Sequence, residues 1–215
     1  MIYQGKEKAV VLDRKDYNSD LVSNVDLAMN FIKQYLPVRY KFTGELTRKE
    51  IPQIPYEALR EAVINAVTHR DYFEKGANVM VEMFDDRIEI TNPGGLVKGL
   101  RPKDFGKKSV LRNPNIANLL HRIKYIEKMG TGISKIRTLI KSAGLRPVKF
   151  EFGTFFTTTF TRAIKKEKEI IGVEKEIYEP INEVLSEAVN EAINEGIIEG
   201  INEEIVARGR AMVMD

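Results

Sequence analysis

The spacing of apolar and polar residues predicts a chain that mixes helices with strands. Strands are expected over residues 8–17 (KAVVLDRKDY) and 38–46 (VRYKFTGEL), where apolar positions cluster or alternate. Between them, apolar residues recur every three or four positions over 18–36, which indicates a helix. A second helix is expected over 57–72 (EALREAVINAVTHRDY), with Pro55 at its first turn, a place that helices tolerate well.

The second half of the chain adds two hairpins and two more helices. One hairpin joins 77–84 to 87–92, and a second is expected within 148–163. Helices are expected over 114–129 and 132–144, the latter ended by a glycine. Antiparallel hairpins mixed with helices favour an α/β fold of the α+β two-layer sandwich type, with helices on one face of a mixed sheet.

A change in composition after residue 163 predicts a separate C-terminal part. Residues 1–163 form the expected domain, residues 164–180 a charged linker, and residues 181–215 an acidic helical or oligomerisation tail. Apolar residues in the tail recur every fourth position, a stripe that winds through about 240° of an ideal helix. They are Ile181, Leu185, Val189, Ile193, Ile197, Ile201 and Ile205. We expect the tail to be ordered by packing on another surface, a second subunit in a homo-oligomer; a frayed acidic tail is the alternative.

Composition excludes several kinds of chemistry. The chain has no Cys, which rules out disulfides, thiolate metal sites and cysteine nucleophiles. It has only two His, so a His-rich metal site is not expected. No apolar run reaches the ~18–20 residues of a membrane span, and the first residues lack the apolar core of a signal peptide. We therefore expect a cytoplasmic protein.

The net charge of +3 conceals an uneven distribution of charged residues. Residues 98–149 contain fourteen Lys and Arg and only two acids, a net charge of +12. Residues 167–215 contain thirteen acids and four Lys and Arg, a net charge of −9. The basic segment is either an ordinary solvated surface or a surface that binds phosphate, from a nucleotide or from nucleic acid.

The polar side of the 57–72 helix has an unusual composition. Glu61, Asn65 and His69 follow one another at four-residue spacing and form a single row. A solvated helix face usually carries long charged residues, whereas Asn and His are mediocre helix formers. The row therefore either faces water or lines a pocket, and both interpretations stay open at this stage.

Two glycine motifs favour the pocket. Gly94 and Gly95 directly follow a predicted strand, where missing side chains let a ligand approach the backbone. Gly130, Thr131 and Gly132 precede a predicted helix, whose free N–H groups and dipole favour an anion. The glycine- and lysine-rich stretch 94–112 reads as a long loop, which inside a compact domain is usually functional or mobile.

Three elements follow one another along the chain: the helix that carries the acid and the amide, the strand that ends in Gly-Gly, and the Gly-Thr-Gly turn that precedes a helix. This order resembles the Bergerat-type ATP-binding fold of gyrase, Hsp-type chaperones, histidine kinases and MutL. Four segments show a closer similarity, to the C-terminal domain of RecG-related ATP-dependent DNA helicases, which are also called transcriptional regulators. The segments are EALREAVINAVTHRDY, FDDRIEITNPGGL, SVLRNPNIANLLHRI and IEKMGTGISKIR. The resemblance covers residues 1–162. Family members often carry an AlbA/Schlafen-type domain before this one and a winged helix after it, and neither is visible in this sequence.

The resemblance implies roles for individual residues. Glu61 would be the catalytic general base, and Asn65 would hold Mg²⁺ beside the phosphates of ATP. Gly94 and Gly95 would line the adenine end. Backbone N–H groups of Gly130, Thr131 and Gly132 would bind the phosphates, and the basic loop would form a lid, with Lys107, Lys108 or Arg112 reaching phosphate oxygens.

One position departs from the pattern of the superfamily. Asn92 stands where an Asp usually accepts a hydrogen bond from the adenine amino group, so the preference for adenine and the ability to turn over are both in question. The chain also lacks a G-x-x-x-x-G-K-[ST] loop, so helicase activity of this chain alone is not expected. The main hypothesis is an ATP-binding domain, with slow hydrolysis left open, that couples the nucleotide to DNA-associated regulation. The alternatives are a DNA-associated module without nucleotide, in which the basic 98–149 segment contacts DNA, and an oligomerisation scaffold built around the tail.

Overall fold

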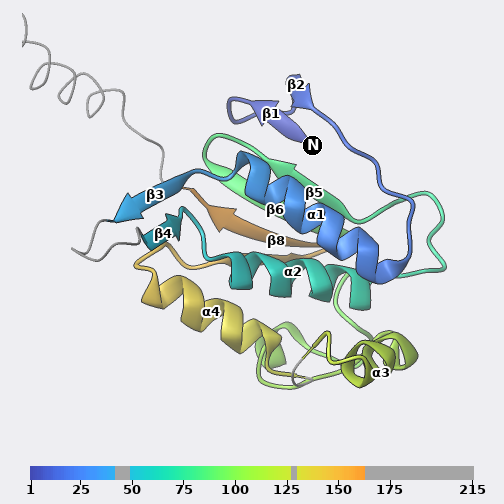
Figure 1. The fold of residues 1–215 in the computed structure, drawn as a ribbon. Coiled ribbons are helices and arrows are strands. Elements are labelled where there is room, and N and C mark those ends of the chain that lie inside the picture. The colour runs from blue at the N-terminus through green and yellow to red at the C-terminus, as the bar shows by residue number, and fades with distance from the viewer. Residues whose placement is uncertain (42–48, 127–129, 163–215) are drawn as a thin grey trace, which may run out of the picture. The chain divides into compact units, whose positions relative to one another are not determined.

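The computed structural model of the chain describes residues 1–41, 49–126 and 130–162. Its main element is a six-stranded sheet in the order β2-β1-β5-β6-β8-β7 (Figure 1). The strands are β1 (Ile2–Gln4), β2 (Val10–Asp13), β5 (Met80–Met83), β6 (Arg87–Pro93), β7 (Lys149–Phe152) and β8 (Phe155–Thr161). β1 and β5 are parallel and the other neighbours are antiparallel, so the sheet is mixed, as predicted. β3 (Val38–Lys41) and β4 (Lys49–Pro52) form a separate antiparallel pair.

Four α-helices and one short 3₁₀ helix accompany the sheet in the described part of the chain. They are α1 (Leu21–Tyr35), α2 (Tyr56–Thr68), η1 (Pro102–Asp104), α3 (Pro114–Arg122) and α4 (Gly132–Ser142). α1 and α2 lie side by side over one face of the sheet, and α4 runs antiparallel to α2 (Figure 1). The predicted α+β sandwich is confirmed.

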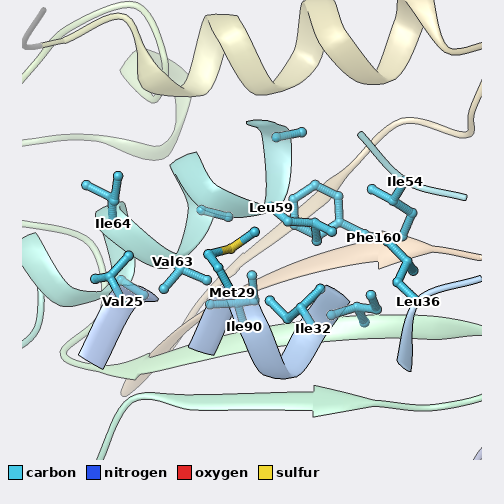
Figure 2. Packing of buried hydrophobic residues seen from close by; sticks show 14 of the residues in the cluster. Val25, Met29, Ile32, Leu36, Ile54, Leu59, Val63, Ile64, Ile90 and Phe160 are labelled. Carbon is cyan, nitrogen blue, oxygen red and sulfur yellow. The ribbon is translucent and has the colours of Figure 1, made fainter. Parts of the chain in front are cut away.

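The hydrophobic core lies between the sheet and the first two helices. Leu59 and Val63 of α2 pack with Met29 and Ile32 of α1, and with Phe160 from β8 (Figure 2). All five side chains are almost fully buried. Because this apolar face of α2 is directed into the core, the polar row on its other side is directed toward α4.

The helix predicted over 114–129 ends earlier than the sequence indicates. α3 stops at Arg122 because Lys124 has a left-handed backbone with φ of 57°. This turn brings Tyr125 against two other helices: its hydroxyl donates to Asp26 Oδ1 at 2.7 Å, and its carbonyl accepts from Arg60 at 3.0 Å. Burial, followed by the hydrogen bond to Asp26, raises the pKa of Tyr125 to about 12, so the phenol remains a donor at neutral pH.

Other predicted elements differ at their ends or lie outside the described residues. Of the strand predicted over 8–17, only Val10–Asp13 is regular, and the strand predicted over 38–46 is described only as far as residue 41. The predicted linker 164–180 and tail 181–215 lie outside the described residues. Within the described ranges, no helix is long and apolar enough to span a membrane.

Candidate functional site

The acid–amide pair of α2 meets the glycine turn that begins α4. Asn65 Nδ2 donates to Glu61 Oε1 at 3.4 Å, so the two side chains form one unit on the helix. Gly132 lies directly against them: a side chain there would place its first carbon 2.9 Å from Asn65 Nδ2 and in overlap with Glu61 Oε1. Glycine at this position is therefore what allows the start of α4 to approach the two polar side chains.

The start of α4 has the features of an anion site. The side chain of Thr131, the N-cap residue, makes no capping hydrogen bond, and the first turn contains no acidic residue. A helix begins with N–H groups that lack intrahelical partners and carries a partial positive charge at this end. These groups face the same region as Glu61 and Asn65, so a negatively charged ligand would be bound next to a carboxylate and an amide.

A cavity of about 160 Å³ occupies this region. A single buried water needs roughly 10–15 Å³ on this scale, so the cavity is large enough for a ligand. Eight of the eleven residues predicted to form the site line it: Glu61, Asn65, Asn92, Gly95, Lys108, Gly130, Thr131 and Gly132. Gly94, Lys107 and Arg112 do not line the cavity. Apolar side chains such as Ile64 and Leu96 complete the walls, which is the usual mixture in a small-molecule site.

Asn92 lines the cavity and holds a buried acceptor without a hydrogen-bond partner. The side chain is 1% exposed, and its Nδ2 donates to the carbonyls of Pro93 at 3.2 Å and His69 at 3.5 Å. Asn92 Oδ1 is buried without a hydrogen-bond partner, as is Thr68 Oγ1, which lines the same cavity. A buried polar atom without a partner costs about 1–3 kcal/mol, so a ligand N–H placed against Asn92 would offset this cost.

Arg112 is held at the turn after β6, on the outside of the cavity. Its Nη2 donates to the carbonyl of Gly95 at 2.7 Å, and its Nη1 lies 3.6 Å from Asp71 Oδ2. The next residue, Asn113, donates through Nδ2 to the carbonyls of Thr68 at 2.9 Å and of Arg70 at 2.8 Å. Together Arg112 and Asn113 fasten the end of the basic loop to the end of α2 and to the turn after β6.

The segment predicted to be a lid is anchored by an aromatic cluster. The ring of Phe105 lies 5.1 Å from that of Phe150, 4.8 Å from that of Phe152 and 5.6 Å from that of Phe156. Gly106, with φ of +76°, packs so closely that an added side chain would lie 2.9 Å from Ile133 Cγ2. The loop therefore lies against the start of α4, where Lys108 lines the cavity. Sequence reasoning missed Phe105, although the phenylalanine-rich hairpin near the end of the domain was a signal of an aromatic partner.

His69 ends α2 and lines the same cavity. Burial, followed by the nearby charge of Arg112, lowers its pKa below the ordinary value of 6.5. The unfolded chain therefore binds this proton at a higher pH than the folded chain does. As the pH falls below about 6.5, the unfolded state takes up the proton first, and the free energy of unfolding should decrease.

This pH dependence can be measured by urea denaturation between pH 8 and pH 5. His69→Gln should flatten the fall in unfolding free energy below about pH 6.5, because the titrating group is removed. His121→Gln is the matched control, since His121 is the other histidine of the chain and its side chain is exposed. Equal pH profiles for wild type and His69→Gln would contradict the assignment.

The mixed sheet, the two covering helices and the cavity between α2 and α4 define a domain of the Bergerat ATPase-like class. Residues 76–160 match the family model described as "Putative ATP-dependent DNA helicase recG C-terminal". The predicted relationship is therefore confirmed. The match begins after α2, so it is the structure that places Glu61 and Asn65 beside the matched residues.

A solved structure supports the fold. The crystal structure of the DIP2311 protein from Corynebacterium diphtheriae superposes with a TM-score of 0.66 at 23% sequence identity. The likeness covers 75% of this chain and 34% of that chain, so this chain spans about a third of the length of the protein it matches. At this identity the likeness shows the fold alone. No curated protein matches the chain.

Proposed function

We propose that this domain binds a nucleoside triphosphate together with Mg²⁺ in the cavity between α2 and α4, and that the nucleotide is ATP. The observation that carries the proposal is the close approach of Gly132 to Glu61 and Asn65. It brings the positive end of a helix, which favours phosphate, next to the two side chains suited to a metal and a water molecule.

The residues present fit a magnesium ion that is held mainly by the nucleotide. Within the described residues, no three His, Cys, Asp or Glu side chains form a metal-binding group. Mg²⁺ in nucleotide sites is typically bound by phosphate oxygens, waters and only one or two protein groups. Asn65 donates through Nδ2 to Glu61, so its amide oxygen is the atom that would bind the cation. Mg²⁺ would supply neutralisation of phosphate charge, and Glu61 would accept a proton from water if hydrolysis occurs.

Asn92 supports adenine as the base. The NH₂ group of its amide donates to two backbone carbonyls, which leaves Oδ1 as the polar atom without a partner. Despite the change from the Asp that the resemblance implies, the position therefore still offers an acceptor. An acceptor can bind the amino group that adenine presents at one edge; guanine and cytosine also carry an amino group, so the comparison of ATP with GTP tests the choice of base.

A second candidate function is DNA binding. A DNA contact would couple the bound nucleotide to DNA-associated regulation. The observation that favours it is the exposure of most of the described basic residues in the 98–149 segment. They are Lys98, Arg101, Lys103, Lys107, Lys108, Arg122, Lys124, Arg137, Lys141, Arg146 and Lys149. Asp104, the one acid of the segment within the described residues, is paired with Arg101 at 2.8 Å. Such a surface would bind phosphate backbones with strong salt dependence.

Homo-oligomerisation through the C-terminal tail is proposed as well.

Thermal unfolding with Mg-ATP and with Mg-GTP tests the nucleotide proposal. Ligand at 100-fold over Kd should add about 2.7 kcal/mol to the stability, and ATP should act at lower concentration than GTP. Asn65→Ala should lose this stabilisation. Asn118→Ala, an exposed residue of α3, is the matched control and should retain it. If neither nucleotide raises the melting temperature while the chain binds DNA in a salt-sensitive manner, the second candidate replaces the first.

A further inference from the structure

Two asparagine side chains share three successive carbonyl groups at the end of α2. Asn113 donates through Nδ2 to the carbonyls of Thr68 at 2.9 Å and of Arg70 at 2.8 Å. Asn92 donates through Nδ2 to the carbonyl between them, that of His69, at 3.5 Å. The end of α2 is therefore held by side chains from two other parts of the chain, the end of β6 and the residue before α3.

Asn113 does not play the usual role of an asparagine at its position. It is the N-cap residue of α3, where an asparagine side chain normally accepts a hydrogen bond from the first turn of its own helix. Its side chain makes no such bond. The half-buried amide instead joins two backbone carbonyls at the end of another helix. The side chain therefore fixes the end of α2 rather than the start of α3.

Backbone carbonyls also determine which way the amide of Asn92 is turned. Its Nδ2 donates to the carbonyl of His69 and, at 3.2 Å, to that of Pro93. If the amide were rotated by half a turn, its oxygen would face two carbonyl oxygens, and these buried acceptors would lose their donor. Oδ1, which is buried without a partner, is therefore the amide atom left for a ligand. Asn92 is thus restricted to the role of an acceptor, although an asparagine can also donate.

Asn113 holds the segment on which this restriction depends. The His69 carbonyl lies between the two carbonyls that Asn113 binds, so these peptide groups cannot rotate without breaking a hydrogen bond. The Pro93 carbonyl also accepts from the backbone N–H of Asp71 at 2.9 Å. Loss of the Asn113 amide would therefore release residues 68–71, which contain one acceptor of the Asn92 amide and bind the other.

We infer that Asn113 is a positioning residue that sets the base preference of the site through Asn92. The inference rests on the proposed function. At the same ring position, adenine presents an amino group and guanine a carbonyl oxygen. An amide restricted to accepting binds the amino group and offers no donor to the carbonyl, whereas a freely turning amide can serve either. Asn113 therefore makes an asparagine select a base as a carboxylate would.

Calorimetric titration of the full chain with Mg-ATP and with Mg-ITP tests the inference. Inosine triphosphate carries a carbonyl where ATP carries the amino group, and its sugar and phosphates are the same. Wild type should bind ATP about 10- to 100-fold more tightly than ITP, the factor expected when one buried hydrogen bond cannot form. Asn113→Ala should reduce this preference to less than about threefold, because the Asn92 amide can then present either atom.

A second variant and a control accompany this measurement. Asn113→Asp keeps the size of the side chain but removes the donor, and it should reduce the preference in the same way. Asn118→Ala, an exposed asparagine of the same helix, should leave the preference unchanged. A merely structural role of Asn113 would weaken the binding of both nucleotides and leave their ratio as it is. The ligand-free variants should stay folded, since the side chain does not cap α3.

The outcomes separate this inference from the function on which it rests. If wild type binds neither nucleotide, the proposed function fails and the inference fails with it. If wild type binds both equally, or if its preference for ATP survives in both Asn113 variants, the inference is wrong and triphosphate binding stands. Melting temperatures of the ligand-free variants complete the test: if both substitutions unfold the domain, Asn113 belongs to the structural framework and the inference is overturned.

Discussion

Gly132→Ala should abolish most nucleotide binding while leaving the domain folded. The added methyl group would overlap Glu61 Oε1 and lie 2.9 Å from Asn65 Nδ2. Both atoms are at the ends of flexible side chains, so the pair can move aside at small cost. Alanine also favours helix over glycine by up to about 1 kcal/mol. The unfolding free energy should therefore change little, whereas displacement of both polar groups should weaken binding of Mg-ATP on the order of 100-fold.

Calorimetric titration with Mg-ATP and urea denaturation of the same samples separate the two effects. Ser134→Ala, an exposed residue in the first turn of the same helix, is the matched control and should retain wild-type affinity. A Gly132→Ala variant with unchanged affinity would show that Glu61 and Asn65 do not contact the nucleotide. A variant that loses several kcal/mol of stability would show that the pair cannot move aside and is part of the packing.

The local part of the site could be predicted because it depends on periodicity and on glycine. The polar row of α2 follows from four-residue spacing, and its direction follows from the apolar residues on the opposite side of the helix. The glycine turn before α4 can likewise be predicted from the sequence, since few other residues allow a ligand or another element to approach the backbone so closely. The meeting of the two elements was implied only by the resemblance to the Bergerat-type fold; in the structure Gly132 lies against Glu61.

The roles of the basic residues could not be predicted, because charge alone does not show which carbonyl or carboxylate a long side chain will reach. Arg112 was one of three basic residues that the resemblance placed within reach of phosphate; in the structure it donates to the carbonyl of Gly95 and lies near Asp71. Lys135 lines the cavity, yet in the sequence it resembles any other lysine of a basic helix. The early end of α3 was missed for a similar reason: Tyr125 contacts Arg60 and Asp26, which are remote in the sequence.

At Gly95 the structure gives a different physical reason for glycine from the one expected from the sequence. Its position after β6 suggested that the missing side chain leaves room for a ligand, and the residue does line the cavity. However, a side chain there would overlap the carbonyl oxygen of Gly153, in the turn between β7 and β8. The space is thus already occupied by backbone, and the residue fixes how closely the last hairpin approaches the turn after β6.

Gly95→Ala should therefore destabilise the domain by about 3 kcal/mol, the upper range for overpacking, because backbone cannot move aside as Glu61 can. Gly99→Ala is the matched control: Gly99 has φ of +90° and open space around it, so its loss measures conformational strain without a clash. That strain should cost about 1 kcal/mol. Urea denaturation of both variants gives the comparison. Equal losses would mean that the hairpin yields readily to the added methyl group, and that glycine at position 95 is required by the ligand rather than by the fold.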